Sequence, residues 1–198
     1  MPGTRRKVII VTDGDRAAGR TVQLAARNVG ARFISLTTGN PTPISGPKVV
    51  ELIKTAPTDP VVIMVDDRGK RGYGKGEKIL QYVTEHPEIN VIGTVAVASN
   101  TSRTEGIRVD ESITRDGSVV EGPVDKLGNP EKTGHKLLEG DTVDVLNKLD
   151  IPVIVGTGDT GKMDFADDFG KGAPVTTKAL KEIINRSENS DRNHEPGT

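Results

Sequence analysis

Two runs of mainly β-branched residues in this chain each end in a pair of acidic residues. Asp13 and Asp15 follow one run near the start of the chain, and Asp66 and Asp67 follow another over residues 61–65. In an open α/β sheet, ligands bind outside the carboxyl ends of the parallel strands, at the point where the strand order reverses. Carboxylates that meet there repel one another unless a cation, a basic group or a shared proton relieves them. The pattern predicts one polar site made by both pairs.

Further side chains follow other predicted strands and suit the same site. Ser99 follows a fourth strand, and Asp159 and Lys162 follow a fifth. Oxygen ligands of this kind favour Mg²⁺ or Ca²⁺ over softer metals, and these two cations are the only cofactors that the residues indicate. The candidate metal ligands are Asp13, Asp15 and Asp66. The complete predicted ligand-binding set is Asp13, Asp15, Asp66, Asp67, Arg68, Ser99, Asp159 and Lys162.

The acidic pairs also have a purely structural interpretation. Asp13 can close a turn while Asp15 caps the following helix, and Asp66 and Asp67 can begin a turn. The loop over residues 68–76 contains four basic residues and four glycines. Such a loop either cradles an anion with its backbone and basic side chains or forms a solvated connection. The sequence leaves these alternatives open.

A glycine-rich segment after the fifth strand has most of a phosphate-binding loop. Gly156, Gly161 and Lys162 have the spacing of that motif, but Met163 stands where a Ser or Thr is needed for magnesium. The residues that follow are acidic and soon interrupted by glycines, so no helix is expected to begin at the lysine. The simpler interpretation is a tight turn that returns Lys162 toward the acidic residues.

Composition excludes several classes of protein. The 27 basic and 28 acidic residues give a net charge of -1 without long blocks of one sign, and aromatic residues make up only 3%, so nucleic acid is not an expected partner. There is no cysteine, and the three histidines form no metal-binding pattern, so disulfides and a zinc site are not expected. No signal peptide and no apolar run long enough to span a bilayer is present, which predicts a soluble protein.

Strand-like and helix-like periods alternate along the chain. The predicted strands cover residues 7–12, 31–36, 61–65, 90–98 and 152–155, and the predicted helices cover residues 15–28, 45–55, 77–85, 140–149 and 175–185. This alternation predicts an α/β fold with a doubly wound, mainly parallel five-stranded sheet in the flavodoxin- or receiver-like order 2-1-3-4-5. Asp116-Gly117 predicts a β-hairpin, residues 107–124, inserted between strands four and five. We expect one domain over residues 1–185 and a flexible polar tail over residues 186–198.

The placing of the candidate residues is similar to two kinds of phosphoryl-transfer protein. Acids after strands one and three, Ser99 after strand four and Lys162 after strand five resemble the layout of receiver domains, although Lys162 lies several residues later than in that layout. The Asp13-x-Asp15 motif resembles that of haloacid-dehalogenase-type phosphatases, whose cap and further motifs are placed differently. No His or Glu is clearly placed as a general base, which argues against ordinary hydrolysis but not against phosphoacceptance.

Four runs resemble the stage V sporulation protein AE family. They are RRKVIIVTDGD at residues 5–15, GNPT at 39–42, VAVAS at 95–99 and PVIVGTGDTGKM at 152–163. The likeness is narrower to the soluble form of this family, encoded in the operon for dipicolinic acid movement in endospore-forming bacteria. It implies a sporulation and germination protein, cytoplasmic or peripheral at the spore inner-membrane surface, that associates with the membrane proteins of the calcium-dipicolinate channel complex. The family supplies no catalytic residues.

Two hypotheses of function follow. The first is a non-enzymatic accessory subunit of the spore calcium-dipicolinate transport complex, which docks on the membrane proteins and binds a ligand or cation at the strand ends. The second is a magnesium-dependent phosphoacceptor or phosphoryl-transfer enzyme, with Asp13 or Asp66 as nucleophile and Lys162 stabilising the phosphoryl group. The sequence does not indicate an oligomeric state.

Overall fold

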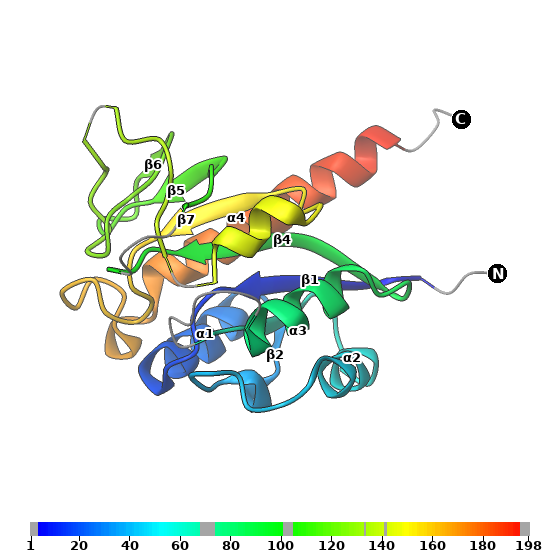
Figure 1. Ribbon diagram of the computed structural model, residues 1–198. Helices are drawn as coiled ribbons and strands as arrows, with labels where there is room; N and C mark the ends of the chain where they lie inside the picture. Colours follow the sequence, from blue (N-terminus) through cyan, green and yellow to red (C-terminus); the bar gives the residue numbers. More distant parts are fainter. Residues whose placement is uncertain (1–3, 68–73, 101–104, 133, 141, 195–198) are drawn as a thin grey trace.

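A mostly parallel sheet of seven strands forms the centre of the protein (Figure 1). The computed structural model describes residues 4–67, 74–100, 105–132, 134–140 and 142–194. The strands are β1 (Arg6–Val11), β2 (Arg32–Phe33), β3 (Val61–Met64), β4 (Ile89–Val97), β5 (Glu111–Ile113), β6 (Val119–Val120) and β7 (Ile154–Thr157). The α-helices are α1 (Arg16–Asn28), α2 (Gly46–Lys54), α3 (Lys75–Thr84) and α4 (Pro174–His194), and short 3₁₀ helices cover Ser35–Thr37, Asp144–Lys148 and Phe169–Lys171.

The strand order differs from the predicted 2-1-3-4-5. The observed order is β2-β3-β1-β4-β7-β5-β6, so β3 lies between β2 and β1. All four residues of β3 are buried, and this strand pairs in parallel with both β1 and β2. β2 has only two residues and exposes Arg32, so it suits the edge of the sheet, where one side is unpaired. The predicted order was therefore wrong, although the expected neighbourhood of strands one and three is observed.

The sheet is also larger than the five predicted strands. The segment predicted as a hairpin forms the antiparallel pair β5 and β6, with Gly117 at a positive φ in the turn. β5 then pairs in parallel with β7, so the hairpin continues the central sheet rather than standing apart from it. A Cβ on Gly156 of β7 would lie 2.3 Å from Oγ of Ser112, which shows how closely the two strands approach. The turn residues in the sequence predict the hairpin, but they do not predict the long-range pairing of β5 with β7.

Helices cover both faces of the sheet. Val8 and Ile10 of β1 face one layer, where they join apolar residues of α2 and α3 and the segment around Leu138 and Leu146. Ile9 and Val11 face the other layer, which contains the buried side chains of α1 and α4. Strands buried on both faces explain the nearly continuous apolar runs in the sequence. Because α1 follows β1 on one face and α3 follows β3 on the other, a switch point lies between these neighbouring strands (Figure 1).

Two predicted segments have different structures. Residues 186–194, expected in a flexible tail, continue α4 as far as His194. Arg186 pairs with Glu111 of β5 and Asp191 pairs with Lys7 of β1, so partners distant in sequence hold this polar half of the helix against the sheet. The predicted helix over residues 140–149 is reduced to the 3₁₀ turn Asp144–Lys148. Thr142, two residues before this turn, has a φ of 64°, which is incompatible with a continuous right-handed helix.

Candidate functional site

A polar pocket of about 220 Å³ lies at the carboxyl ends of β1, β3, β4 and β7. Six of the eight predicted ligand-binding residues line it, and these six are Asp13, Asp15, Asp66, Ser99, Asp159 and Lys162. The other lining residues are Thr12, Asn40, Val97, Ala98 and Lys126. We call this cavity the strand-end pocket. Its position agrees with the expectation that a doubly wound sheet binds ligands at the switch point.

The turn after β1 is fixed by its own aspartates. Oδ1 of Asp13 accepts hydrogen bonds from the backbone N–H groups of Gly14 and Asp15, at 2.6 and 3.2 Å. Oδ1 of Asp15 accepts from the N–H of Ala18, at 2.8 Å, and so caps α1. The structural interpretation of this pair is therefore correct. It does not exclude a ligand role, because both side chains also line the pocket.

Gly14 allows the turn after β1 to approach the segment that follows β3. A Cβ at this position would lie 2.3 Å from the carbonyl oxygen of Gly39 and 2.5 Å from Cβ of Asp66. Asp66 is held by its backbone, which exchanges two hydrogen bonds with Thr42, one through the N–H of each residue. A side chain at position 14 would force these segments apart. Because Gly14 has no side chain, Asp66 can lie in the same pocket as Asp13.

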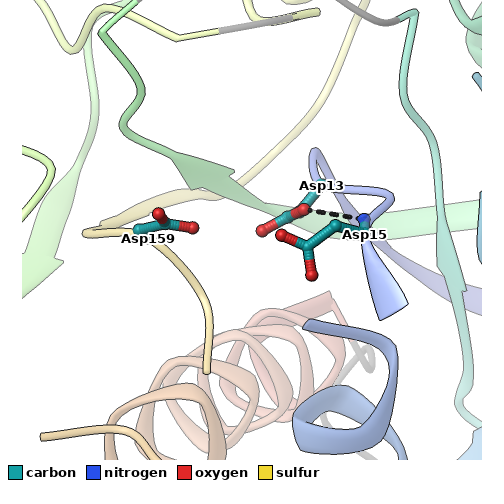
Figure 2. A group of neighbouring side chains, drawn as sticks. All are labelled: Asp13, Asp15 and Asp159. Carbon is teal, nitrogen blue, oxygen red and sulfur yellow. Dashed lines mark hydrogen bonds between the residues drawn. The ribbon is translucent and has the colours of Figure 1, made fainter. Parts of the chain in front are cut away.

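Three carboxylates in the pocket lie close enough to share one cation. Oxygen atoms of Asp13, Asp15 and Asp159 all lie within 4.8 Å of one another (Figure 2). The first two come from the turn after β1 and the third from the turn after β7, two strands away in the sheet. In the described part of the chain this is the group with metal-binding spacing, and it contains Asp159 in place of the predicted Asp66. The order of the strands, which the sequence did not reveal, decides which acid is third.

Lysine side chains already neutralise part of this cluster. Nζ of Lys162 lies 2.5 Å from Oδ2 of Asp15 and 3.0 Å from Oδ1 of Asp159, and Nζ of Lys126 lies 3.6 Å from the other oxygen of Asp159. Burial opposes the charge on Lys162, but its hydrogen bonds to the two carboxylates raise its pKa above the ordinary value. Burial likewise opposes the charge on Asp15, yet the bond from Lys162 lowers the pKa of this carboxyl. Both groups are charged at neutral pH.

The pKa of Asp13 is raised, in contrast to that of Asp15. Burial and the neighbouring charges of Asp15 and Asp159 raise its pKa from 3.8 to about 7, and the hydrogen bonds from its own turn only partly compensate. Asp13 receives no ion pair from either lysine in the described structure. Its carboxyl group is therefore partly protonated near neutral pH. A cation bound beside it would favour the ionised form, so proton and cation compete for this group.

Two predicted ligand residues are not in the pocket. The carboxylate of Asp67 accepts hydrogen bonds from the N–H groups of Gly76 and Glu77, at 2.5 and 2.9 Å, and so binds the first turn of α3. Gly74 permits this contact, because a Cβ there would lie 2.5 Å from Oδ1 of Asp67. Asp67 therefore has a structural role, as a hydrogen-bond acceptor for the start of α3, and the turn that it was predicted to begin falls on residues 68–73, outside the described residues. Arg68 and most of the basic loop lie outside the described residues.

Five lining residues of the pocket were not predicted, and three of them are polar. Asn40 lies in the loop after β2, and Thr12 uses its hydroxyl to accept a hydrogen bond from the N–H of Val97. Lys126 belongs to the loop after β6, where its carbonyl oxygen accepts a hydrogen bond from the N–H of Asp159. Asn40 follows a predicted strand and could have been found by that rule. Lys126 follows no strand of the parallel set, so the sequence contains no comparable signal for it.

The glycine-rich segment after β7 is not a phosphate-binding loop. Gly156 lies inside β7, and Lys162 lies in a turn, with the next α-helix beginning at Pro174. Gly158 allows the turn to touch the loop that contains Lys126, because a Cβ at Gly158 would lie 2.6 Å from N of Gly128. The expectation that Lys162 returns to the acidic residues is confirmed by its contacts with Asp15 and Asp159.

The comparisons with known proteins point to one family. Residues 7–187 match the model of a family described as stage V sporulation protein AE1. No curated protein and no solved structure matched the chain. Among the described residues, no helix combines the length and the apolar character that crossing a membrane would require.

Proposed function

Because the chain belongs to the stage V sporulation protein AE1 family, we propose that it is a non-enzymatic accessory protein of sporulation that binds a small ligand in the strand-end pocket. In this proposal it docks, at the spore inner-membrane surface, on the membrane proteins of the calcium-dipicolinate channel complex and has a role in sporulation and germination. The family membership supports the sporulation role. The charge pattern of the pocket is the observation that supports ligand binding.

The pocket contains charges of both signs within a small volume. Asp13, Asp15 and Asp159 offer oxygen atoms to a cation, while Lys126 and Lys162 offer ammonium groups to an anion. Its volume of about 220 Å³ is below the range of about 300–1,000 Å³ that is usual for drug-sized ligands. These features suit a calcium ion chelated by a small dicarboxylate better than they suit a nucleotide. Calcium dipicolinate, which the family resemblance implies, has this chemistry.

Calorimetric titration tests ligand binding. We expect calcium dipicolinate to bind to the purified protein more tightly than Ca²⁺ or Mg²⁺ alone. Asp159→Asn and Lys162→Met, which remove one charge of each sign, should each weaken binding of the chelate about tenfold or more, because each removes a charge-assisted contact. Asp150→Asn, which changes an exposed aspartate outside the pocket, is the matched control and should bind as the original protein does. If none of these ligands binds, ligand binding is rejected and docking alone remains.

A phosphoacceptor is the second candidate, because the pocket brings together side chains that such a site uses. Asp13, Asp66, Ser99 and Lys162 all line it. Two features weigh against this role. Lys162 is paired with Asp15 and Asp159, and the raised pKa of Asp13 leaves that nucleophile only partly ionised at neutral pH. Incubation with a small phosphodonor and Mg²⁺, followed by intact-mass measurement, decides the matter: an added phosphoryl group that Asp13→Asn or Asp66→Asn abolishes would replace our proposal.

A further inference from the structure

Two of the three phenylalanines of this protein are exposed in the loop that joins β7 to α4. The side chains of Phe165 and Phe169 are 69% and 53% exposed, whereas Phe33 is buried in the sheet. Both exposed rings lie within the segment 163–173, which we call the Phe loop. A single exposed apolar side chain needs no explanation, but a pair of large aromatic side chains on one loop is a common mark of an interaction surface.

The Phe loop has a fixed conformation that directs these rings outward. Met163, Asp164 and Phe165 all have positive φ angles, of 48°, 54° and 63°, which is rare for consecutive residues other than glycine. Met163 is buried, and the buried carboxylate of Asp167 accepts hydrogen bonds from two N–H groups at the start of α4, at 2.9 Å each. The loop is therefore anchored on both sides of Phe165. Such strain persists only where the surrounding structure maintains it.

Basic side chains without partners lie beside the loop. Arg16 and Arg20, one turn apart at the start of α1, and Lys171 of the Phe loop are all exposed, and their side chains form no hydrogen bond or ion pair with any described residue. The two arginines share one face of the helix, repel each other and lie at the positive end of its dipole. They line, together with Phe169, a surface pocket of about 610 Å³ that also contains Asp168. An anionic neighbour would relieve this repulsion.

We propose that Arg16, Arg20, Phe165, Phe169 and Lys171 form a docking surface for a bilayer that contains anionic phospholipids. The Phe loop and the first turn of α1 lie together at the carboxyl-end edge of the sheet, at the left of Figure 1. The aromatic rings enter the boundary between headgroups and acyl chains, and the cationic side chains pair with lipid phosphates. A small free anion would satisfy the arginines but would leave both rings in water, so the combination favours a membrane.

This surface shares no lining residue with the strand-end pocket. Asp168, the one acidic side chain in the surface pocket, accepts a hydrogen bond from the N–H of Gly170 and caps the 3₁₀ turn of the loop. Asp164 is paired with Arg115 at 3.1 Å. Neither carboxylate forms an ion pair with Arg16 or Arg20. Lipid binding therefore neither requires nor excludes a ligand among Asp13, Asp15 and Asp159.

Tryptophan fluorescence tests insertion directly, because the chain contains no tryptophan. Phe165→Trp and Phe169→Trp each introduce one reporter at an exposed aromatic position. We expect vesicles of phosphatidylglycerol and phosphatidylcholine to shift the emission of both reporters to shorter wavelength, and brominated lipid to quench it. Tyr82→Trp, on α3 at the opposite face of the sheet, is the matched control and should show neither change. Unchanged emission of both loop reporters overturns the proposal.

Vesicle flotation tests the charges and the rings separately. We expect Arg16→Gln/Arg20→Gln to weaken binding to phosphatidylglycerol vesicles about tenfold or more, whereas Arg27→Gln, at the other end of α1, has a much smaller effect. Phe165→Ser/Phe169→Ser should have a similar effect to the double arginine variant while keeping the circular dichroism spectrum. Asp13→Asn should float as the original protein does, which separates this proposal from ligand binding in the strand-end pocket. Equal binding to pure phosphatidylcholine vesicles, or no effect of both double variants, overturns the proposal.

Discussion

Replacing Asp13 by asparagine should change how the stability of this protein depends on pH. Asparagine has nearly the same shape, and its Oδ1 can accept the hydrogen bonds that Gly14 and Asp15 donate to Asp13. It cannot ionise, so the variant removes the charge and retains the turn. The pKa of Asp13 is raised in the folded protein from 3.8 to about 7, first by burial and then by the charge of Asp15.

The direction of this pH dependence follows from which state of the protein, folded or unfolded, binds the proton of Asp13 more tightly. Between about pH 4 and pH 7 the folded protein retains the proton of Asp13 while the unfolded chain has lost it, so the free energy of unfolding falls as pH rises. The loss is complete above about pH 7. Each pKa unit corresponds to about 1.4 kcal/mol, so the decrease in the free energy of unfolding between pH 5 and pH 7 amounts to at most about 3 kcal/mol. Because solvent reaches one side of the pocket, we expect about 1.5 kcal/mol.

Urea unfolding at about pH 5 and pH 8 measures this effect. Asp13→Asn should increase the free energy of unfolding relative to the original protein, and this increase should be about 1.5 kcal/mol larger at pH 8 than at pH 5. Taking this difference cancels other groups that titrate in both proteins, including the buried Asp167. Asp150→Asn, at an exposed position, should show no such pH dependence. If the gain from Asp13→Asn is the same at both pH values, the raised pKa and the electrostatic account of the pocket are refuted.

Three other substitutions test how the site is built. Gly14→Ala should lower the free energy of unfolding by about 1–3 kcal/mol, measured by urea titration, because the new Cβ would overlap the carbonyl oxygen of Gly39. Asp167→Ala should lower it by about 3 kcal/mol, since two buried N–H groups at the start of α4 lose their acceptor, and thermal melting should show the loss. Lys162→Met should cost about 1 kcal/mol at pH 8, measured by urea titration, because Asp15 and Asp159 each lose a charged partner.

Local features of the site were predictable from the sequence because they depend on residues close together in the chain. Asp15 precedes a helical period and caps α1, and Lys162 follows a glycine-rich turn that returns it to the acids. The rule that ligands gather at strand ends was enough to select most of the pocket residues. The rule could not separate Asp66 from Asp67, since adjacent residues of a turn point in different directions.

Long-range pairing accounts for the rest. No local sequence pattern indicates that β3 lies between β2 and β1, that β5 pairs with β7, or that Asp159 is the third acid beside Asp13. These facts depend on the burial of whole strands and on which edge each strand can tolerate. The extension of α4 has the same origin, because its polar half is held by partners on β1 and β5 rather than by its own sequence.

The edges of the sheet restrict how another protein can bind to this one. In the part of the chain that the structure describes, the two outermost strands, β2 and β6, have two residues each. Recognition by strand addition needs an extended row of unpaired backbone groups, and strands this short offer almost none. The same shortness protects the protein from edge-to-edge aggregation. We therefore expect a protein partner to recognise side chains on helices and loops. These side chains, rather than backbone groups, determine the specificity of such an interaction.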